Sequence, residues 1–199
     1  MNVEALNKEA LEGVLEATVN AKQENRAKAA SHVLAQKELF SALVSLTFDV
    51  DKPISIKAAW VLEWICTHGN LQLLYPNLDQ FTHQINKLKF DSAIRPCSKI
   101  CEYLAKEFYS EKESSIHEFL NEKHIEAIVE VGFDWLLKPQ KIAVRAYTME
   151  TLYLFGLQLN WIHPELEHLI STKIIHESKG CEARGKKILK LIKKNQKTR

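Results

Sequence analysis

The sequence predicts an all-α protein built from about five helical pairs that stack side by side. Apolar residues recur at intervals of three and four along almost the whole chain, which is the periodicity of an amphipathic helix. Only six glycines and five prolines interrupt 199 residues, too few for the turns of a many-stranded sheet. Five similar segments, each with a basic residue near its start, recur along the chain. Together these observations indicate a repeated two-helix unit.

The first helix of each pair is expected to bury one apolar stripe. In the second pair, for example, Phe40, Leu43 and Val44 follow helical spacing. These first helices are predicted near residues 3–20, 38–48, 76–88, 123–137 and 164–178.

The second helices begin with a basic residue followed by small and apolar ones. Their basic residues are separated by 31, 38, 50 and 39 residues. A period near 40 with two helices per unit is typical of a helical solenoid. The 50-residue interval leaves room for a polar insertion near 110–123, with a short helix over 116–120. The segments are "NRAKAASHVLA" with Arg26, "SIKAAWVLEWI" with Lys57, "AIRPCSKICEYLA" with Arg95, "AVRAYTMETLYLF" with Arg145 and "EARGKKILKLI" with Arg184.

The prolines are consistent with this division. Pro53, Pro76, Pro139 and Pro164 fall where helices are expected to begin, and Pro96 is expected in a first turn. Proline is tolerated there because the first amides of a helix have no intrahelical partner. None is therefore expected in the middle of a helix.

The second helices resemble those of the HEAT-type helical repeat, which begin with a hydrophobic residue and then Arg or Lys. The match is seen in Ile56-Lys57, Ile94-Arg95 and Val144-Arg145, and more weakly in Asn25-Arg26 and Ala183-Arg184. The resemblance covers nearly the whole chain. It implies one domain over 1–199 with a HEAT-like, armadillo-like right-handed α-α superhelix.

The resemblance also implies that an acid in a turn pairs with the basic residue of a neighbouring unit. Asp51, Asp91 and Glu182 are the candidate acids. A basic side chain in the first turn can pack its stem on apolar neighbours while its charged head reaches the adjacent turn. We favour this stacking role, because a buried charge needs a fixed partner. The alternative is that the basic residues line a concave groove and bind an anionic partner.

Composition and motifs indicate a protein without recognisable catalytic chemistry. The net charge is +2, and no nucleotide-binding, hydrolase or zinc-protease motif is present, so no cofactor is expected. The N-terminal residues lack the apolar region of a secretory signal, and no apolar run is long enough for a bilayer. We therefore expect a cytoplasmic protein with no membrane contact and with reduced cysteines.

The favoured function is a non-catalytic scaffold that binds a protein or peptide in the concave groove of the second helices. Such a solenoid presents an extended curved surface on which a partner can lie. The residues expected to line this groove are Lys57, Trp60, Trp64, Arg95, Lys99 and Arg145.

A second interpretation is nucleic-acid binding, with or without base excision. Trp60, Glu63 and Trp64 lie within two turns, and an acid between indoles can serve as a general base. This cluster distantly resembles the HEAT-like alkyl-DNA glycosylases, which implies Glu63 as the catalytic residue. Packing of the two indoles in the core or groove is the simpler interpretation.

The C-terminal segment is the most polarised part of the chain. Residues 184–199 hold eight Lys or Arg and no acid, whereas the rest of the chain is net acidic. We expect a capping helix over 182–199, because the end unit of a solenoid needs a polar outer face. The alternative is a helix that contacts nucleic-acid phosphates. Its candidate residues are Lys186, Lys187, Lys190 and Lys193.

The cysteines are not expected to bind a metal. Cys97 and Cys101 are four residues apart, and Cys66 and His68 lie in an earlier unit. This spacing is not that of a zinc site. Buried free cysteines of this kind usually act as small hydrophobic residues.

Overall fold

The computed structural model describes residues 3–197, and every regular element within them is helical. All ten expected helices are present. The first helices of the pairs are α1 (Val3–Glu16), α3 (Leu39–Thr47), α5 (Leu78–Gln84), α8 (Glu122–Leu137) and α10 (Ile162–Thr172). The second helices are α2 (Gln23–Ala35), α4 (Ile54–Thr67), α6 (Asp91–Phe108), α9 (Ile142–Phe155) and α11 (Lys179–Gln196). Four short helices complete this part of the chain: η1 (Leu71–Asn77), η2 (Ile85–Lys87), α7 (Ile116–Phe119) and η3 (Ile174–His176).

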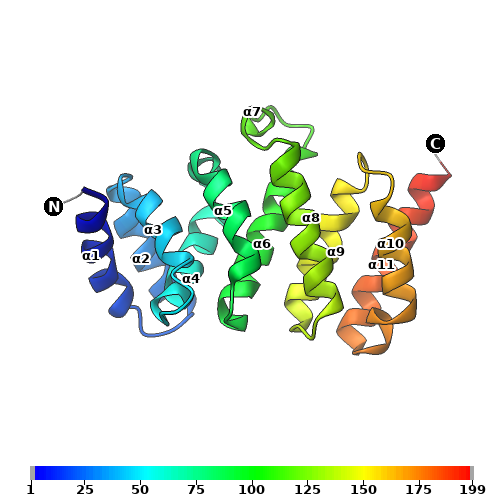
Figure 1. Cartoon of the computed structure of the whole chain (residues 1–199), viewed down its shortest axis with the longest axis horizontal. Coiled ribbons are helices and arrows are strands. Elements are labelled where there is room, and N and C mark those ends of the chain that lie inside the picture. Colours follow the sequence, from blue (N-terminus) through cyan, green and yellow to red (C-terminus); the bar gives the residue numbers. More distant parts are fainter. Residues whose placement is uncertain (1–2, 198–199) are drawn as a thin grey trace.

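The helices form two rows along the long axis of the molecule. The first helices follow one another across the front of Figure 1, and the second helices lie behind them. Each second helix packs closely on the next, with α6 contacting α4 and α9 most extensively. The first helices contact one another less, and α8 and α10 make the fewest contacts of any neighbours in that row. The front row is therefore more open than the back row.

Burial along a helical stripe explains why these segments form the two rows. In α9, Val144, Met149, Leu152 and Phe155 are fully buried at spacings of three to five residues. Each side chain of this size removed from water stabilises the fold by about 1.5–3 kcal/mol. The core is continuous along the molecule, so each pair covers the apolar flank of its neighbours.

The first helix is shorter than predicted. It ends at Glu16, not near residue 20, because Thr18 closes a tight turn. The Thr18 amide donates to the Leu15 carbonyl at 3.0 Å, and its hydroxyl donates to the Val14 carbonyl at 3.1 Å. Val19, whose apolar side chain suggested a longer helix, is 79 % exposed.

Three prolines lie at helix starts, and two do not. Pro53 precedes α4, Pro164 lies in the first turn of α10, and Pro139 precedes α9. Pro76 lies inside η1 instead of beginning an α-helix. Pro96 lies in the second turn of α6, because α6 begins at Asp91, before the predicted start.

The structure has helices in the predicted insertion and in the basic C-terminal segment, with bounds that differ from those predicted. The connection between α6 and α8 contains α7, whose Ile116 is fully buried. The basic helix α11 begins at Lys179, three residues before the predicted start at 182, because the Ser178 hydroxyl caps it by accepting a hydrogen bond from the Cys181 amide at 3.1 Å. Residues 198–199 of the predicted capping helix lie outside the described residues.

In the part of the chain that the structure describes, no helix has both the length and the apolar character needed to cross a membrane.

Candidate functional site

Most of the residues predicted to line a groove on the second helices bind partners within the protein. The Lys57 ammonium donates to the Glu16 carbonyl at 2.9 Å, and the Trp60 indole Nε1–H donates to the Ser92 carbonyl at 3.1 Å. The Trp64 ring stacks on His68 with ring centroids 3.8 Å apart. The first contact joins the basic residue of one unit to the preceding unit, and the second joins α4 to α6 of the next unit.

Glu63 joins three consecutive second helices. Its Oε2 accepts from Arg26 of α2 at 2.6 Å, and its Oε1 accepts from Lys99 of α6 at 2.6 Å. The Glu63 side chain is buried and lies between two cations, not between two indoles. The Arg26 guanidinium also lies 5.0 Å from the Trp64 ring centre. Both carboxylate oxygens are thus occupied by structural partners.

The space beside Glu63 is small. A cavity of about 20 Å³ lies between α2, α4, α6 and α9, and Tyr147 closes it from α9. Such a volume holds about one water molecule. A flipped base would need far more room, so this geometry does not favour Glu63 as a catalytic residue.

Arg145 is buried at the junction of the last two units. Its side chain is 3 % exposed, and its terminal nitrogens donate to the Leu136 carbonyl at 2.8 Å and the Lys138 carbonyl at 3.1 Å. Its Nε lies 2.6 Å from a carboxylate oxygen of Glu177. Arg145 therefore ties the end of α8 to the segment that follows η3.

The turn acids do not pair as the family resemblance implied. Asp51 pairs with Lys89, which is not one of the five repeated basic residues. Glu182 pairs with Lys186 of its own helix at 2.6 Å, and Asp91 has no ion pair in the described chain. The acids that join units lie elsewhere: Glu63, Glu177, and Glu150, which accepts from Arg184 at 2.9 Å.

Arg95 differs from the other predicted groove residues. Its side chain is exposed, and within residues 3–197 its guanidinium has no ion pair or hydrogen bond. It is therefore the member of the predicted set that is best placed to bind a ligand on the second row.

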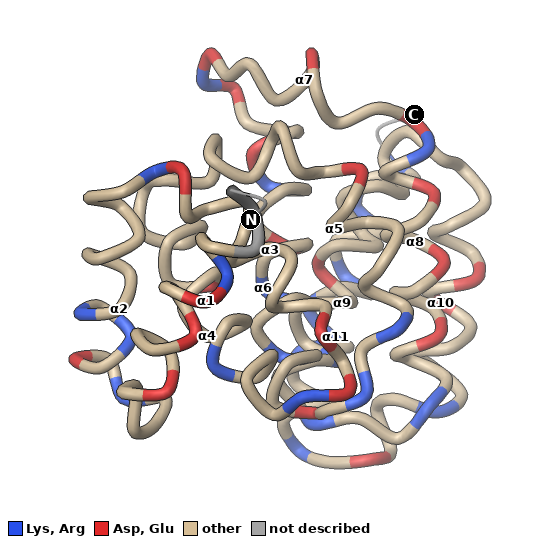
Figure 2. Tube along the Cα trace, turned by 60° about the vertical axis from the view of Figure 1, so that its left-hand side comes forward, with Lys and Arg blue, Asp and Glu red and all other residues tan. Residues whose placement is uncertain are grey.

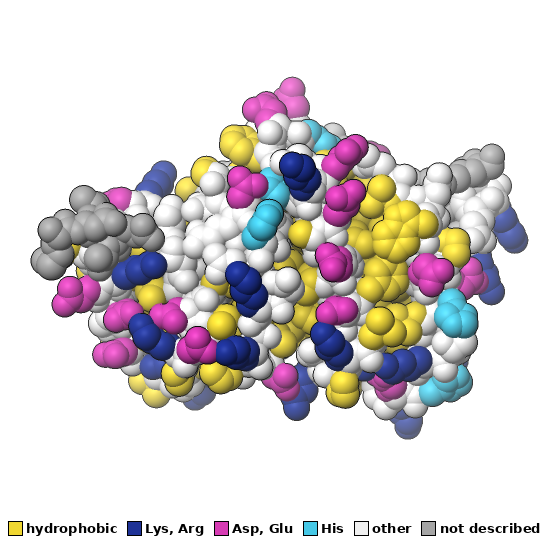
Figure 3. Space-filling model, viewed as in Figure 1, with side chains coloured by type: hydrophobic (Ala, Val, Ile, Leu, Met, Phe, Trp, Pro, Cys, Tyr) yellow, Lys and Arg dark blue, Asp and Glu magenta, His cyan; other side chains and the backbone are white. Residues whose placement is uncertain are grey.

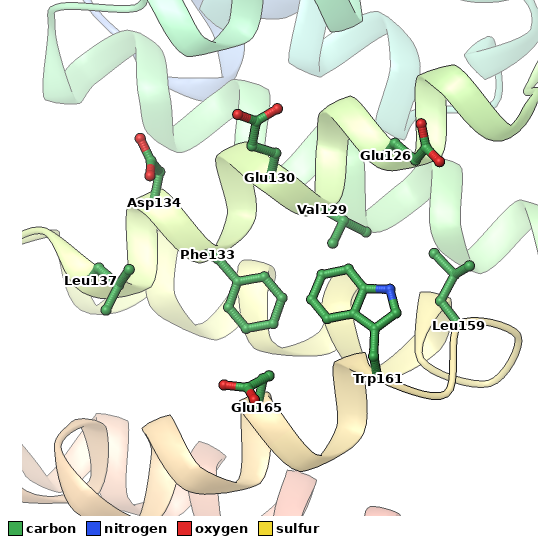
Figure 4. A pocket seen from close by; sticks show the side chains of 9 residues that line it. All are labelled: Glu126, Val129, Glu130, Phe133, Asp134, Leu137, Leu159, Trp161 and Glu165. Carbon is green, nitrogen blue, oxygen red and sulfur yellow. The ribbon is translucent and has the colours of Figure 1, made fainter.

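A larger groove lies on the opposite row, between α8 and α10. It has a volume of about 810 Å³, and Figure 3 shows hydrophobic side chains gathered there on the surface. Phe133 of α8 stacks on Trp161, which directly precedes α10, with ring centroids 5.6 Å apart and planes 26° apart. Trp161 and Leu137 are each 55 % exposed. Val129 and Leu159 complete the apolar floor (Figure 4).

Carboxylates border this apolar floor. Glu126, Glu130 and Asp134 follow at intervals of four on α8 and so share one face of that helix. Figure 4 shows them along one edge of the groove, with Glu165 of α10 at the other. Glu126, Glu130 and Glu165 are exposed and have no ion pair within the described residues, whereas Asp134 pairs with Lys138 at 2.7 Å.

The charge of the two helices is strongly one-sided. They carry four acids on α8 and two on α10, against a single lysine, Lys123. Figure 2 shows these acidic residues along the traces of both helices. Lys138 and Lys173 directly follow the two helices at the Leu137 end of the groove, where Lys173 donates to the Leu137 carbonyl. The groove therefore combines an apolar floor with a mainly acidic border.

The exposed lysines of α11 form a different surface at the C-terminal end. A shallow hollow there is lined by Lys187, Lys190, Leu191 and Lys193, with two further lysines. Lys187 lies 3.8 Å from Glu150, and Lys186 pairs with Glu182. The predicted phosphate-binding lysines are thus gathered on one helix, although two of them have acidic neighbours.

The four cysteines are buried and free. Burial raises the pKa of the Cys66 and Cys97 thiols well above the usual value, and that of Cys101 to about 12. Among the described residues no three His, Cys, Asp or Glu side chains are arranged to hold a metal ion.

Comparison with known protein families, with curated proteins and with solved structures finds no significant match to this chain. The α8–α10 groove was not predicted from the sequence. Acids at 122, 126, 130 and 134 beside apolar residues at 129, 133 and 137 form the pattern that could have indicated it.

Proposed function

We propose that this protein is a non-catalytic helical-repeat scaffold that binds a segment of another protein. We propose that its five stacked helix pairs form a HEAT-like right-handed superhelix. The more closely packed second row, which suits the inner side of a curved stack, supports the curvature of this arrangement. The extensive internal pairing of the second-row side chains supports a structural role for the repeated basic residues.

The binding surface that the geometry supports best is the α8–α10 groove. The observation that carries this proposal is the exposed Trp161, which stacks on the half-buried Phe133 beside the exposed Leu137 over an open apolar floor. Exposed clusters of this kind mark interaction sites, and tryptophan is enriched among residues that dominate binding energy. The second-row groove around Arg95 is the competing location.

The two locations can be separated by selecting peptides from a random displayed library on the wild-type protein. Selected peptides should lose at least about tenfold in affinity for Trp161→Ala, which removes an anchor of this size. They should bind Arg95→Ala and the surface control Val19→Ser normally, since both positions lie outside the α8–α10 groove. Dependence on Arg95 instead of Trp161 would place the site on the second row. Failure to select any peptide that binds the wild-type protein would contradict the proposed function.

Nucleic-acid binding is a second candidate, favoured by the lysine surface of α11. Binding of this kind should weaken steeply with salt, because phosphate contacts release counterions. Replacing Lys190 and Lys193 with Gln should flatten that salt dependence, whereas Lys8→Gln at the other end of the chain should not. A wild-type protein that binds no single- or double-stranded DNA or RNA at low salt would exclude this candidate.

A further inference from the structure

The acidic border of the α8–α10 groove limits what can occupy it. Anionic lipid surfaces and nucleic-acid phosphates would be repelled by Glu126, Glu130 and Glu165, which form no ion pair within the described residues. A partner that covers the apolar floor must therefore bring positive charge to its edges. Otherwise the carboxylates would lose water without gaining a partner.

The spacing of the acids indicates the form of that partner. Glu126, Glu130 and Asp134 extend over about 12 Å of α8, because an α-helix rises 1.5 Å per residue. A helix laid along α8 would present its own residues at the same spacing of three or four. Its apolar face would cover Phe133 and Trp161, and a basic flank would face the acids.

A second copy of the chain is a weaker occupant. The strongest basic surface of the described chain is α11, but of its apolar residues, Ile188 and Ile192 are buried within its own molecule, and Leu189 and Leu191 are half-buried. It would offer lysines to the groove with little apolar side chain to cover the floor. A segment of another protein is therefore better able to supply both the basic residues and the apolar side chains that the groove needs.

We propose that the α8–α10 groove binds an amphipathic helix of a partner protein that carries Lys or Arg along one flank and large apolar residues on its face. This inference rests on the proposed function, because it names the partner class for the same groove. The apolar floor supplies most of the affinity, and the acids select a basic partner and align it.

The probe is a synthetic peptide of about 18 residues, long enough for appreciable helix formation, with leucines at helical spacing and lysines on one flank. A matched peptide has Glu in place of every Lys. Fluorescence anisotropy should show the lysine peptide binding at least about tenfold more tightly at low salt. This preference should shrink as salt rises, because the acids are exposed.

Charge reversal gives the decisive comparison. Glu126→Lys/Glu130→Lys should favour the glutamate peptide over the lysine peptide. Glu9→Lys/Glu24→Lys changes the net charge equally on α1 and α2, at exposed positions at the other end of the molecule, and should keep the wild-type preference. Trp161→Ala should weaken binding of the lysine peptide, whereas Val19→Ser should not.

Three results would overturn the inference. Equal binding of the lysine peptide to wild type and Trp161→Ala would show that the peptide lies elsewhere. If library-selected peptides depend on Trp161 but carry no basic flank, the proposed function would stand and the inference of a basic partner would be wrong. Self-association of the wild-type chain that Trp161→Ala abolishes would identify a second copy as the occupant.

Discussion

The Trp60 indole Nε1–H donates a 3.1 Å hydrogen bond to the Ser92 carbonyl, which is the carbonyl that Pro96 leaves without an intrahelical partner. In an α-helix the amide of residue 96 would bond to the carbonyl of residue 92, and proline has no amide hydrogen. The side chain of α4 thus replaces a missing bond of α6. An irregularity in one helix is in this way coupled to the packing of two neighbouring units.

This coupling predicts a non-additive pair of substitutions. Trp60→Phe keeps most of the ring and removes the donor, so it should lower the free energy of unfolding by about 0.5–1.5 kcal/mol. In a Pro96→Ala background the same change should cost less, because alanine supplies the helical amide that Pro96 lacks. Urea denaturation of the four proteins forms the double-mutant cycle. An additive result would show that Trp60 acts only through its ring.

Arg145 and Arg95 occupy matching places in consecutive repeats but should respond differently to the same change. Arg145→Lys should destabilise the fold by about 2–4 kcal/mol, because a lysine cannot reach two carbonyls and Glu177 at once from a buried position. Arg95→Lys, at an exposed position, should change stability by no more than about 0.5 kcal/mol. Urea midpoints measure both. Equal effects would contradict the distinct roles that the structure gives these two residues.

The helices were predictable because their information is local. Apolar spacing, and a basic residue such as Arg145 followed by small ones, located all ten paired helices and the short helix α7. The boundaries were less accurate where a single polar contact decides them. The hydrogen bonds of Thr18 end α1 before the apolar pattern of the sequence ends. The cap formed by Ser178 starts α11 before its basic residue Arg184, which was expected near the start of the helix.

The contacts between units were not predictable in the same way, because they depend on how adjacent helices are rotated and spaced. Glu63 reaches Arg26 and Lys99 from the middle of α4, where the sequence alone left a catalytic role open. The groove likewise depends on the separation of α8 and α10. That separation leaves Trp161 exposed and Phe133 only half-buried, and no local pattern specifies it.

Asp79 should contribute stability in a pH-dependent way. It lies on α5, and its carboxylate is 2.6 Å from His124 Nε2 of α8, whose Nδ1 accepts the Asn121 amide. The hydrogen bond that Asp79 accepts from His124 Nε2 lowers the pKa of Asp79 below its usual value of 3.8. A carboxyl with a depressed pKa in the folded state stabilises the fold above its unfolded pKa and loses this effect as pH falls through the folded pKa.

The measurement is the difference in unfolding free energy between wild type and Asp79→Asn as a function of pH. Near pH 6 the wild type should be the more stable protein, and below the usual pKa of 3.8 the difference should shrink. Other carboxyl groups titrate in both proteins and cancel in the comparison. A difference that stays constant down to about pH 2 would contradict the role of the Asp79 charge.

Gly156 should be required for full stability, because the space beside its Cα is too small for a side chain. A Cβ built on Gly156 would lie 2.2 Å from His163 Cδ2 and 2.4 Å from Nε2, although its backbone angles suit any residue. His163 is buried, donates to the Tyr153 carbonyl at 2.9 Å and stacks on the Tyr153 ring. Gly156→Ala must displace this ring or the start of α10. We expect destabilisation by about 1–3 kcal/mol, as for other overpacked sites.

Gly13 provides the matched control, because it lies inside α1 and a Cβ added there would have nothing within 4 Å. Gly13→Ala should stabilise the protein by about 0.5–1 kcal/mol through helix propensity alone.

The clash can be tested directly, since Gly156→Ala should cost much less stability in a His163→Ala background. Because Trp161 lies two residues from His163, Gly156→Ala should also weaken peptide binding in the α8–α10 groove. Unchanged stability in Gly156→Ala would mean that α10 can shift freely, and the spacing of the groove would then not be fixed by this contact.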